Sequence, residues 1–230
     1  MNRGHPLCLQ SLIMRLGSVA LVRLKAVAGI FLRKGAHISV PRHLCEYARR
    51  SDGCAAAVAL DHGAAGVFMS HGDVVDSRKF HIRVKDTVKA LGDLAAHYRQ
   101  KFQMPIVGIT GSVGKTSTKE MISAALETGF HIMKTAGNQN SQIGVPLTLF
   151  RMEKGQELAV VEMGISEIGE MENLVRFVQP DVAVVTNIGE AHSARFGQTE
   201  NTLKEKLKFA MNFTETQRIL INGDDPPLRR

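Results

Sequence analysis

The sequence predicts an α/β fold in which a parallel sheet is covered by helices on both faces and carries a phosphate-binding (P-loop-type) loop. From residue 105 onward, short apolar segments alternate with segments of helical length, as in sheets whose strands are buried on both sides. A glycine-rich loop ending in Lys-Thr follows the first apolar segment. Polar clusters follow each predicted strand, at the edge where parallel sheets bind ligands.

The alternation of apolar and amphipathic segments defines the elements of this sheet. Buried strands are short and bounded by polar or glycine-containing residues, whereas the helices between them are longer and half polar. The strands are expected at 105–110, 131–135, 157–163, 181–186 and 217–222, and the helices at 115–128, 142–150, 168–178 and 199–212.

A small, incomplete α/β domain is predicted to precede the sheet, over residues 51–103. A helix near Ala55–Ala59 ends at glycine, and a helix over 86–99 has Asp86 or Thr87 available as its N-cap. Strands are expected at 67–70 and 81–84. The segment Gln103-Met104-Pro105 interrupts the pattern and indicates a domain boundary.

The net charge of +7 is confined to one segment of the chain. Residues 1–50 contain nine Lys or Arg and one acidic residue, whereas the remainder contains 20 basic and 21 acidic residues. A nucleic-acid-binding role for the whole chain is therefore not expected. The alternative is a basic N-terminal module in 1–50 that contacts a membrane or nucleic acid.

The apolar segment Leu12–Leu32 does not have the pattern of a membrane-spanning helix. Arg15, Arg23 and Lys25 interrupt the segment, whereas a spanning helix needs roughly 20 continuous apolar residues, so no stable membrane insertion is expected. A basic amphipathic helix on a membrane surface is the alternative.

The three cysteines lack Cys-x-x-Cys spacing, which favours a reduced cytoplasmic setting over disulfides or a zinc site.

The glycine-rich loop follows the strand predicted at 105–110. Successive N–H groups of such a loop, with the N-terminus of the next helix, surround a phosphate. Lys115 is expected to contact the terminal phosphates and the Thr116 hydroxyl a Mg²⁺ ion. The alternative is a tight turn that binds nothing. The residues expected to bind the cofactor are Gly111, Ser112, Val113, Gly114, Lys115, Thr116 and Ser117.

Further Mg²⁺ ligands are expected at other strand ends, because this ion prefers hard oxygen donors. Glu162 follows a predicted buried strand and is the best candidate, with a carboxylate that caps the next helix as the alternative. His192 follows the strand predicted at 181–186. Histidine is a less usual Mg²⁺ ligand, and an ordinary loop histidine is the alternative there.

Taken in order, these segments resemble the Mur ligases, ATP-dependent enzymes that build the peptide stem of the bacterial cell wall. The family's loop is T-G-x-x-G-K-[ST] without an earlier glycine, which accounts for Ile109. Among the family's branches, the segments are most similar to the one that adds D-alanyl-D-alanine. The resemblance is carried by Thr110–Glu120, Gly137–Asn140, Glu162–Gly164, Asn187–His192, Asn222–Asp225 and Asp86–Ala95.

The resemblance implies an amide-forming ligase with ATP and Mg²⁺ as cofactors and a cytoplasmic location. ATP would phosphorylate the terminal carboxylate of a UDP-N-acetylmuramoyl-tripeptide, and the amine of D-Ala-D-Ala would then attack. By the same resemblance, 1–50 is an atypical basic segment, 51–103 a remnant of the UDP-substrate domain, and 104–230 the ATP-binding central domain, incomplete at its C-terminus. The alternatives are a nucleotide-binding fragment without turnover and another branch of the family.

The resemblance also implies roles for individual residues. Lys115, Lys206 and His192 would be catalytic, with Lys206 as the family's carbamoylated lysine and Lys204 as the competing position. Thr116 and Glu162 would hold one Mg²⁺ and His192 a second. Substrate or phosphate would contact Asn138, Asn140 and Ser141, and the nucleotide base or ribose would lie near Asn222 and Asp225.

Overall fold

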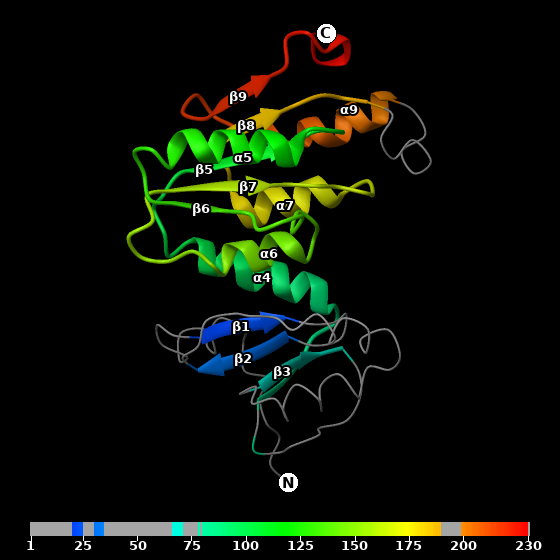
Figure 1. Ribbon diagram of the computed structural model, residues 1–230. Helices are drawn as coiled ribbons and strands as arrows, with labels where there is room; N and C mark the ends of the chain where they lie inside the picture. Colours follow the sequence, from blue (N-terminus) through cyan, green and yellow to red (C-terminus); the bar gives the residue numbers. More distant parts are fainter. Residues whose placement is uncertain are drawn as a thin grey trace. The chain divides into compact units, whose positions relative to one another are not determined.

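The computed structural model describes residues 20–24, 30–34, 66–70, 78, 80–189 and 199–229. The chain divides into two compact units, Met1–Ala90 and Leu91–Arg230. The first unit holds a four-stranded sheet and the second a five-stranded sheet (Figure 1). Helix α4 (Thr87–Arg99) spans the division between the units, and the domain boundary expected between 103 and 104 stays a prediction.

The five-stranded sheet of the second unit is parallel, as predicted, with the order β6-β7-β5-β8-β9. Each strand lies within one residue of its predicted bounds at both ends, because each is a short apolar run that ends at polar residues. The strands are β5 (Ile106–Thr110), β6 (Ile132–Lys134), β7 (Leu158–Glu162), β8 (Val182–Val185) and β9 (Arg218–Ile221).

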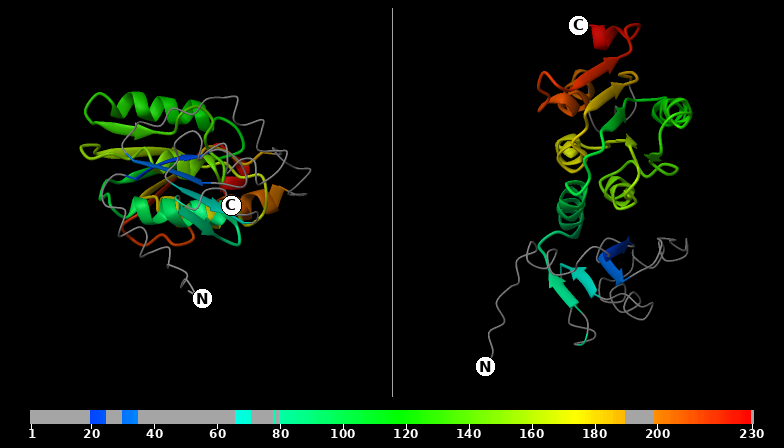
Figure 2. Two further views of the ribbon diagram at one scale, coloured as in Figure 1. Left: turned by 90° about the horizontal axis from the view of Figure 1, so that it is seen from below. Right: turned by 90° about the vertical axis from the view of Figure 1, so that its left-hand side faces the viewer.

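Helices cover both faces of this sheet, which confirms the predicted fold class. In the right-hand view of Figure 2, α5 (Lys115–Leu126) lies on one side of the strands. On the other side lie α7 (Glu170–Val178) and α9 (Thr199–Leu207). Helix α6 (Gly144–Leu149) packs against α7 and is shorter than the predicted 142–150.

The central strand β5 packs against the turn that follows α9. Ile106 and Ile109 of β5 are fully buried, as a central parallel strand requires. Between them, Gly108 has no side chain, and a Cβ there would lie 2.5 Å from a ring carbon of Phe209. Phe209 belongs to the 3₁₀ turn η1 (Lys208–Ala210), which directly follows α9. This contact holds the end of α9 against β5.

The first unit contains the order β1-β2-β3-β4, antiparallel except for the parallel β3–β4 pair. Strands β3 (Gly66–Met69) and β4 (Phe80–Arg83) confirm the two predicted strands with a shift of one residue. The helix considered for Leu12–Leu32 is wrong where the structure describes that segment, because β1 (Ala20–Leu24) and β2 (Ile30–Lys34) are strands. A segment of five residues whose apolar run is interrupted by basic residues suits either structure.

Helix α4 begins as the sequence predicts. The Asp86 carboxylate accepts the N–H groups of Val88 at 2.8 Å and Lys89 at 3.0 Å, so Asp86 provides the N-cap. The helix predicted near Ala55–Ala59 lies outside the described residues. In the part of the chain that the structure describes, no helix combines the length and apolarity that a bilayer span requires.

Candidate nucleotide-binding site

The candidate site lies where the parallel strands of the second unit end. The loop 111–114 follows β5, the loop 135–143 follows β6, and Glu162 is the last residue of β7. The segments 186–189 and 222–225 follow β8 and β9. Because the strands are parallel, all these segments lie at one edge of the sheet, as expected for a ligand site.

The loop after β5 turns on two glycines with positive φ, Gly111 at 147° and Gly114 at 80°. A Cβ at Gly111 would lie 1.9 Å from Thr186 Oγ1, so no side chain fits there. The loop opens α5, and the bond from Thr118 N–H to the Gly114 carbonyl, at 2.9 Å, joins its first turn. Leading N–H groups of a helix lack intrahelical partners and attract anions.

Asn187, which follows β8, holds the first half of this loop. Its Oδ1 accepts the N–H groups of Ser112 at 3.1 Å and Val113 at 3.0 Å. Ser112 also donates its N–H to the Asn187 carbonyl and its hydroxyl to the Gly189 carbonyl. Sequence reasoning gave Asn187 no role, although its place after a strand was a signal. The N–H groups of Ser112 and Val113 would have to exchange partners to bind phosphate.

Two lysine ammonium groups converge on the Gly111 carbonyl. Lys115 Nζ donates to it at 2.8 Å and to the Ser112 carbonyl at 3.1 Å, while Lys206 Nζ donates to it at 3.1 Å. Lys204, the competing position in the sequence, is exposed, so the structure brings Lys206 and not Lys204 to the loop. The loop therefore carries the Lys115 cation, which suits a polyphosphate, and a second lysine, Lys206, at the same carbonyl.

Burial governs the charge of both lysines. It lowers the pKa of Lys206 to about 8, with a further lowering from the nearby Lys115 charge and an opposing effect of Glu205. Burial also lowers the pKa of Lys115, and the Glu162 carboxylate opposes this effect. Near neutral pH, a fraction of Lys206 is a neutral amine.

The lowered pKa of Lys206 predicts a pH dependence of stability. Between pH 8 and 10.5 the unfolded chain binds the proton that the folded chain has lost, so the free energy of unfolding should rise with pH. Relative to Lys206→Met, the wild-type protein should gain up to about 1.4 kcal/mol per pH unit in that window. Urea unfolding at pH 7 and pH 9.5 measures this gain. Parallel behaviour of the two proteins would contradict it, and exposed Lys204→Met is the control.

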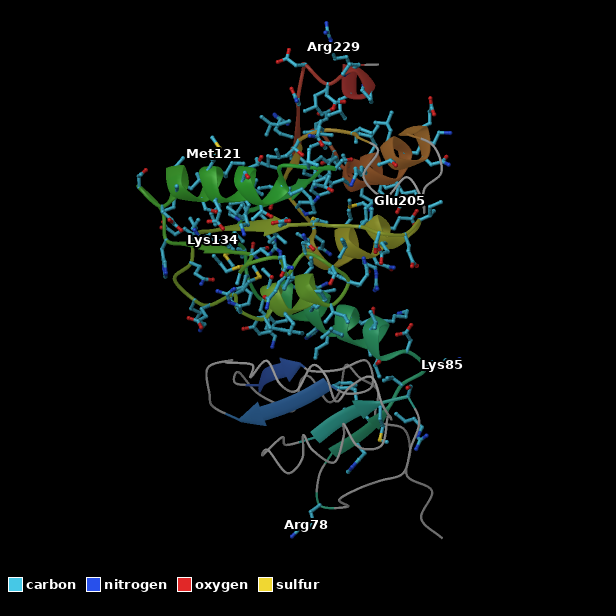
Figure 3. The ribbon with its side chains drawn as sticks, turned by 45° about the vertical axis from the view of Figure 1, so that its right-hand side comes forward. Arg78, Lys85, Met121, Lys134, Glu205 and Arg229 are labelled. Atoms are coloured by element: carbon cyan, nitrogen blue, oxygen red, sulfur yellow. The ribbon has the colours of Figure 1, made fainter. Side chains whose placement is uncertain are left out.

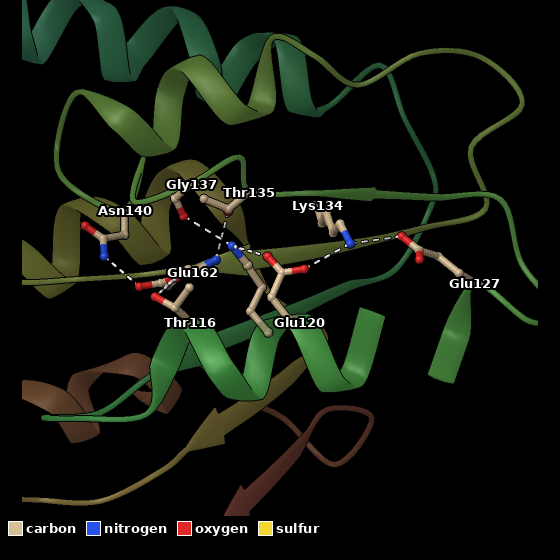
Figure 4. Close-up of polar contacts among 9 residues, drawn as sticks. Thr116, Glu120, Glu127, Lys134, Thr135, Gly137, Asn140 and Glu162 are labelled. Carbon is tan, nitrogen blue, oxygen red and sulfur yellow. Dashed lines mark hydrogen bonds and ion pairs between the residues drawn. The ribbon is translucent and has the colours of Figure 1, made fainter. Parts of the chain in front are cut away.

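Glu162 is buried and makes contacts from three sides (Figure 4). Thr116 Oγ1 donates to its Oε2 at 3.0 Å, and Asn140 Nδ2 donates to its Oε1 at 2.7 Å. Its own N–H donates to Thr135 Oγ1 at 3.0 Å. Two predicted metal ligands, Thr116 and Glu162, thus lie in contact, and a buried carboxylate beside a hydroxyl fits the oxygen preference of Mg²⁺.

The other predicted ligand, His192, lies outside the described residues. Within the described ranges, no three His, Cys, Asp or Glu side chains gather as a metal site, so the candidate set is one carboxylate and one hydroxyl.

The alternative role of Glu162 as a helix cap finds no support. The segment before α7 is bonded instead by Glu170, which accepts the Ser166 N–H at 2.6 Å, and by Glu205.

Glu205 on α9 joins that helix to the start of α7 (Figure 3). Its buried Oε1 accepts the N–H groups of Gly169 at 2.8 Å and Met171 at 3.2 Å. Its Oε2 pairs with Lys208 at 3.0 Å. These bonds hold the residue next to Lys206 in place. Sequence reasoning missed Glu205, because a glutamate between lysines is typical of a solvated helix face.

The three predicted substrate residues lie in the loop after β6. Asn140 contacts Glu162, and its N–H donates to the Asn138 carbonyl at 2.8 Å. The Asn138 side chain is exposed. Ser141 Oγ accepts the Gly144 N–H at 3.3 Å at the start of α6. Their contacts with substrate stay predictions.

The predicted base or ribose contacts, Asn222 and Asp225, follow β9. Asp225 is buried, and its carboxylate accepts the N–H groups of Ile188 at 3.0 Å and Leu228 at 3.2 Å. Asn222 Oδ1 accepts the Asp224 N–H at 3.0 Å. In the structure Asp225 supports the segment after β8, which also carries Asn187, and nucleotide contacts of both residues stay predictions.

Comparison with known proteins places the sheet and its loop in a family. The model of the Mur ligase middle domain matches residues 109–230. The UDP-N-acetylmuramoyl-tripeptide–D-alanyl-D-alanine ligase of Bacillus subtilis is 44% identical over 148 residues, which cover 64% of this chain and 32% of that protein. The protein of the same name from Treponema pallidum is 41% identical over 135 residues, or 58% of this chain and 29% of the relative.

A solved structure agrees with these relatives. The crystal structure of MurF ligase from Thermotoga maritima in complex with ADP has a TM-score of 0.68 and 35% identity, over 74% of this chain and 40% of that one. The chain spans about a third of the length of the curated relatives that it matches. Since the family match extends over more than half of the chain, including α5 and the strands around it, the chain belongs to the Mur ligase family through its middle domain.

Proposed function

We propose that the chain binds ATP with Mg²⁺ and supplies the nucleotide-binding part of a ligase that joins D-Ala-D-Ala to UDP-N-acetylmuramoyl-tripeptide. The observation that carries the proposal is the 3.0 Å contact of Thr116 with buried Glu162, beside a loop on which Lys115 and Lys206 converge. The names of the bacterial relatives and the ADP in the Thermotoga maritima structure support the same choice.

In this proposal the first turn of α5 binds the phosphates. The N–H groups from Gly114 to Ser117 open the helix, and helix N-termini favour anions. Lys115 would exchange its bonds to the loop carbonyls for charge-assisted bonds to phosphate oxygens, which are stronger. Gly111 would provide the turn of the loop, and Asn187 would hold its first half in place beside this contact.

Thr116 and Glu162 are the residues proposed to hold Mg²⁺, and His192 is proposed for a second ion. The bound ion would neutralise charge on the transferring phosphoryl group. Asn140 already bonds one oxygen of Glu162, and Thr116 bonds the other, so the carboxylate is oriented by two protein groups. Such support is typical of residues around a metal.

Lys206 is proposed as the carbamoylated lysine. Carbamate formation needs a neutral amine, which attacks carbon dioxide and releases a proton. A buried lysine with a pKa of about 8 supplies that amine near neutral pH. The exposed position of Lys204 offers no comparable environment.

The proposed reaction has two steps. The terminal carboxylate of the tripeptide takes the γ-phosphoryl group of ATP, giving an acyl-phosphate and ADP. The amine of D-Ala-D-Ala then attacks the acyl carbon, phosphate leaves with its bonding electrons, and the amine loses a proton. Lys115 would stabilise the transferring group by its charge, while Asn138 and Ser141 would contact substrate. A cytoplasmic location is part of this proposal, since the reaction consumes ATP.

A ligase assay tests the proposed function. The chain is incubated with ATP, Mg²⁺, UDP-N-acetylmuramoyl-tripeptide and D-Ala-D-Ala, and mass spectrometry follows the joined product and phosphate. We expect product only when ATP and the dipeptide are both present. Joining of a single amino acid in place of the dipeptide would assign the chain to another branch, and ATP binding without product would restrict it to nucleotide binding.

A further inference from the structure

Lys119 is a fully buried lysine that the proposed function does not use. It lies on α5 three residues after Thr116, so the two side chains share one face of the helix. Its side chain is 0% exposed. Lysines are almost never fully buried unless their charge is paired, because burial of a charge is costly. The ammonium group of Lys119 must therefore be held by polar partners inside the protein.

The ammonium group of Lys119 joins α5 to Gly137, in the loop after β6. Nζ donates to the Gly137 carbonyl at 3.2 Å and pairs with Glu120 Oε1 at 2.9 Å. Glu120 also pairs with Lys134 of β6 at 3.0 Å, and Lys134 with Glu127 at 3.2 Å. The side chains of Glu120, Lys134 and Glu127 are partly exposed, so the ion pairs among them contribute little to the stability of the fold. The bond to Gly137 is the one that extends the network into the loop.

The same loop contacts Glu162 at both its backbone and its carboxylate. Thr135, at its start, accepts the Glu162 N–H at 3.0 Å, and Asn140, near its end, donates to Glu162 Oε1 at 2.7 Å. Gly137 lies between these two residues with a φ of 54°. Since Asn140 follows Gly137 by only three residues, a shift of the Gly137 carbonyl would move the Asn140 amide relative to Glu162.

Resting on the proposed function, we propose that Lys119 is a positioning residue for the Mg²⁺ site. By holding the Gly137 carbonyl, it keeps the Asn140 amide on one oxygen of Glu162 while the other oxygen faces the Thr116 hydroxyl. Helix α5 thus acts on Glu162 twice, directly through Thr116 and indirectly through Lys119. Lys115 bonds the carbonyls of Gly111 and Ser112 and not this loop, so we expect its contact with phosphate to be independent of Lys119.

The test measures ATP binding by calorimetry in Mg²⁺ and in EDTA for the full chain and its variants. Lys119→Met removes the ammonium group with little change in length. It should reduce the gain in affinity from Mg²⁺ by about tenfold, as expected when a hydrogen bond to a charged group is lost. Affinity in EDTA should stay at the wild-type value. Lys134→Met, which removes an outer charge of the same network, should keep the wild-type gain.

A double variant shows whether Lys119 acts through Asn140. If it does, Lys119→Met combined with Asn140→Ala should lose no more of the Mg²⁺ gain than Asn140→Ala alone, because the two residues act in series. Additive losses would overturn the proposal, and so would equal weakening of binding in Mg²⁺ and EDTA, which indicates a purely structural role. Should Lys119→Met fail to fold, Lys119→Gln is measured in the same way.

The outcomes separate this inference from the function on which it rests. A wild-type chain whose ATP binding does not respond to Mg²⁺ would contradict the proposed function, and this inference with it. A responsive wild-type chain with an unchanged gain in the Lys119 variants would contradict the role of Lys119 alone.

Discussion

Replacing Lys115 with alanine is expected to weaken ATP binding in the presence of Mg²⁺ by about a hundredfold, the effect of losing a charge-assisted bond to phosphate worth roughly 3 kcal/mol. Lys115 is the first residue of α5, and its Nζ lies 2.8 Å from the Gly111 carbonyl in the loop before that helix, where phosphate is proposed to bind. No other part of the fold should change, because the side chain is only half-buried. Calorimetric titration with ATP measures the loss.

Lys154→Ala is the matched control for this variant. Lys154 is exposed and lies between α6 and β7, away from the strand ends that carry the candidate site. The same substitution there should leave ATP affinity within the error of the titration. Equal affinities of Lys115→Ala and wild type would show that the loop does not bind the phosphates.

Replacing Gly92 with alanine is expected to destabilise the protein by about 3 kcal/mol, against the usual gain of helix propensity. A Cβ at Gly92 of α4 would lie 2.0 Å from a ring carbon of Phe177, which is buried on α7. The methyl group and the ring cannot both keep their positions, so the packing of α4 on α7 would be lost. Urea unfolding measures the change.

Gly129→Ala is the control for the stability measurement. A Cβ at Gly129 meets no atom within 4 Å, and its backbone has no positive φ. That substitution should change the free energy of unfolding by about 0.5 kcal/mol or less, as most surface substitutions do. A Gly92→Ala protein as stable as wild type would contradict the packing of α4 against Phe177.

The parallel sheet could be predicted because its signals are local. Each strand of the second unit is a short apolar run with a polar end, and Asp86 caps α4 as its type and position indicate. The strands β1 and β2 could not be predicted in the same way. Their apolar residues are interrupted by basic ones, and five residues are too few to separate a period of two from one of 3.6.

The candidate site was predictable in part for the same reason. Thr116 lies just after the loop that follows β5, and Glu162 ends the neighbouring parallel strand β7, so their meeting at one edge follows from the topology. The bonds of Asn187 to the loop and of Lys119 to Gly137 depend on register and on the rotation of α5, which residue types do not reveal. Glu205 looks like a surface residue in the sequence and is buried in the structure.

The measurement that tests the central claim most directly is calorimetric titration of the unmodified chain with ATP, in Mg²⁺ and in EDTA, with AMP as the comparison. We expect one binding site for ATP, tighter in Mg²⁺ than in EDTA, because Thr116 and Glu162 lie together at the phosphate loop. AMP, which lacks the terminal phosphates, should bind far more weakly. A folded chain that binds neither nucleotide, or binds both equally, would contradict the claim that these strand ends form a site for ATP and Mg²⁺.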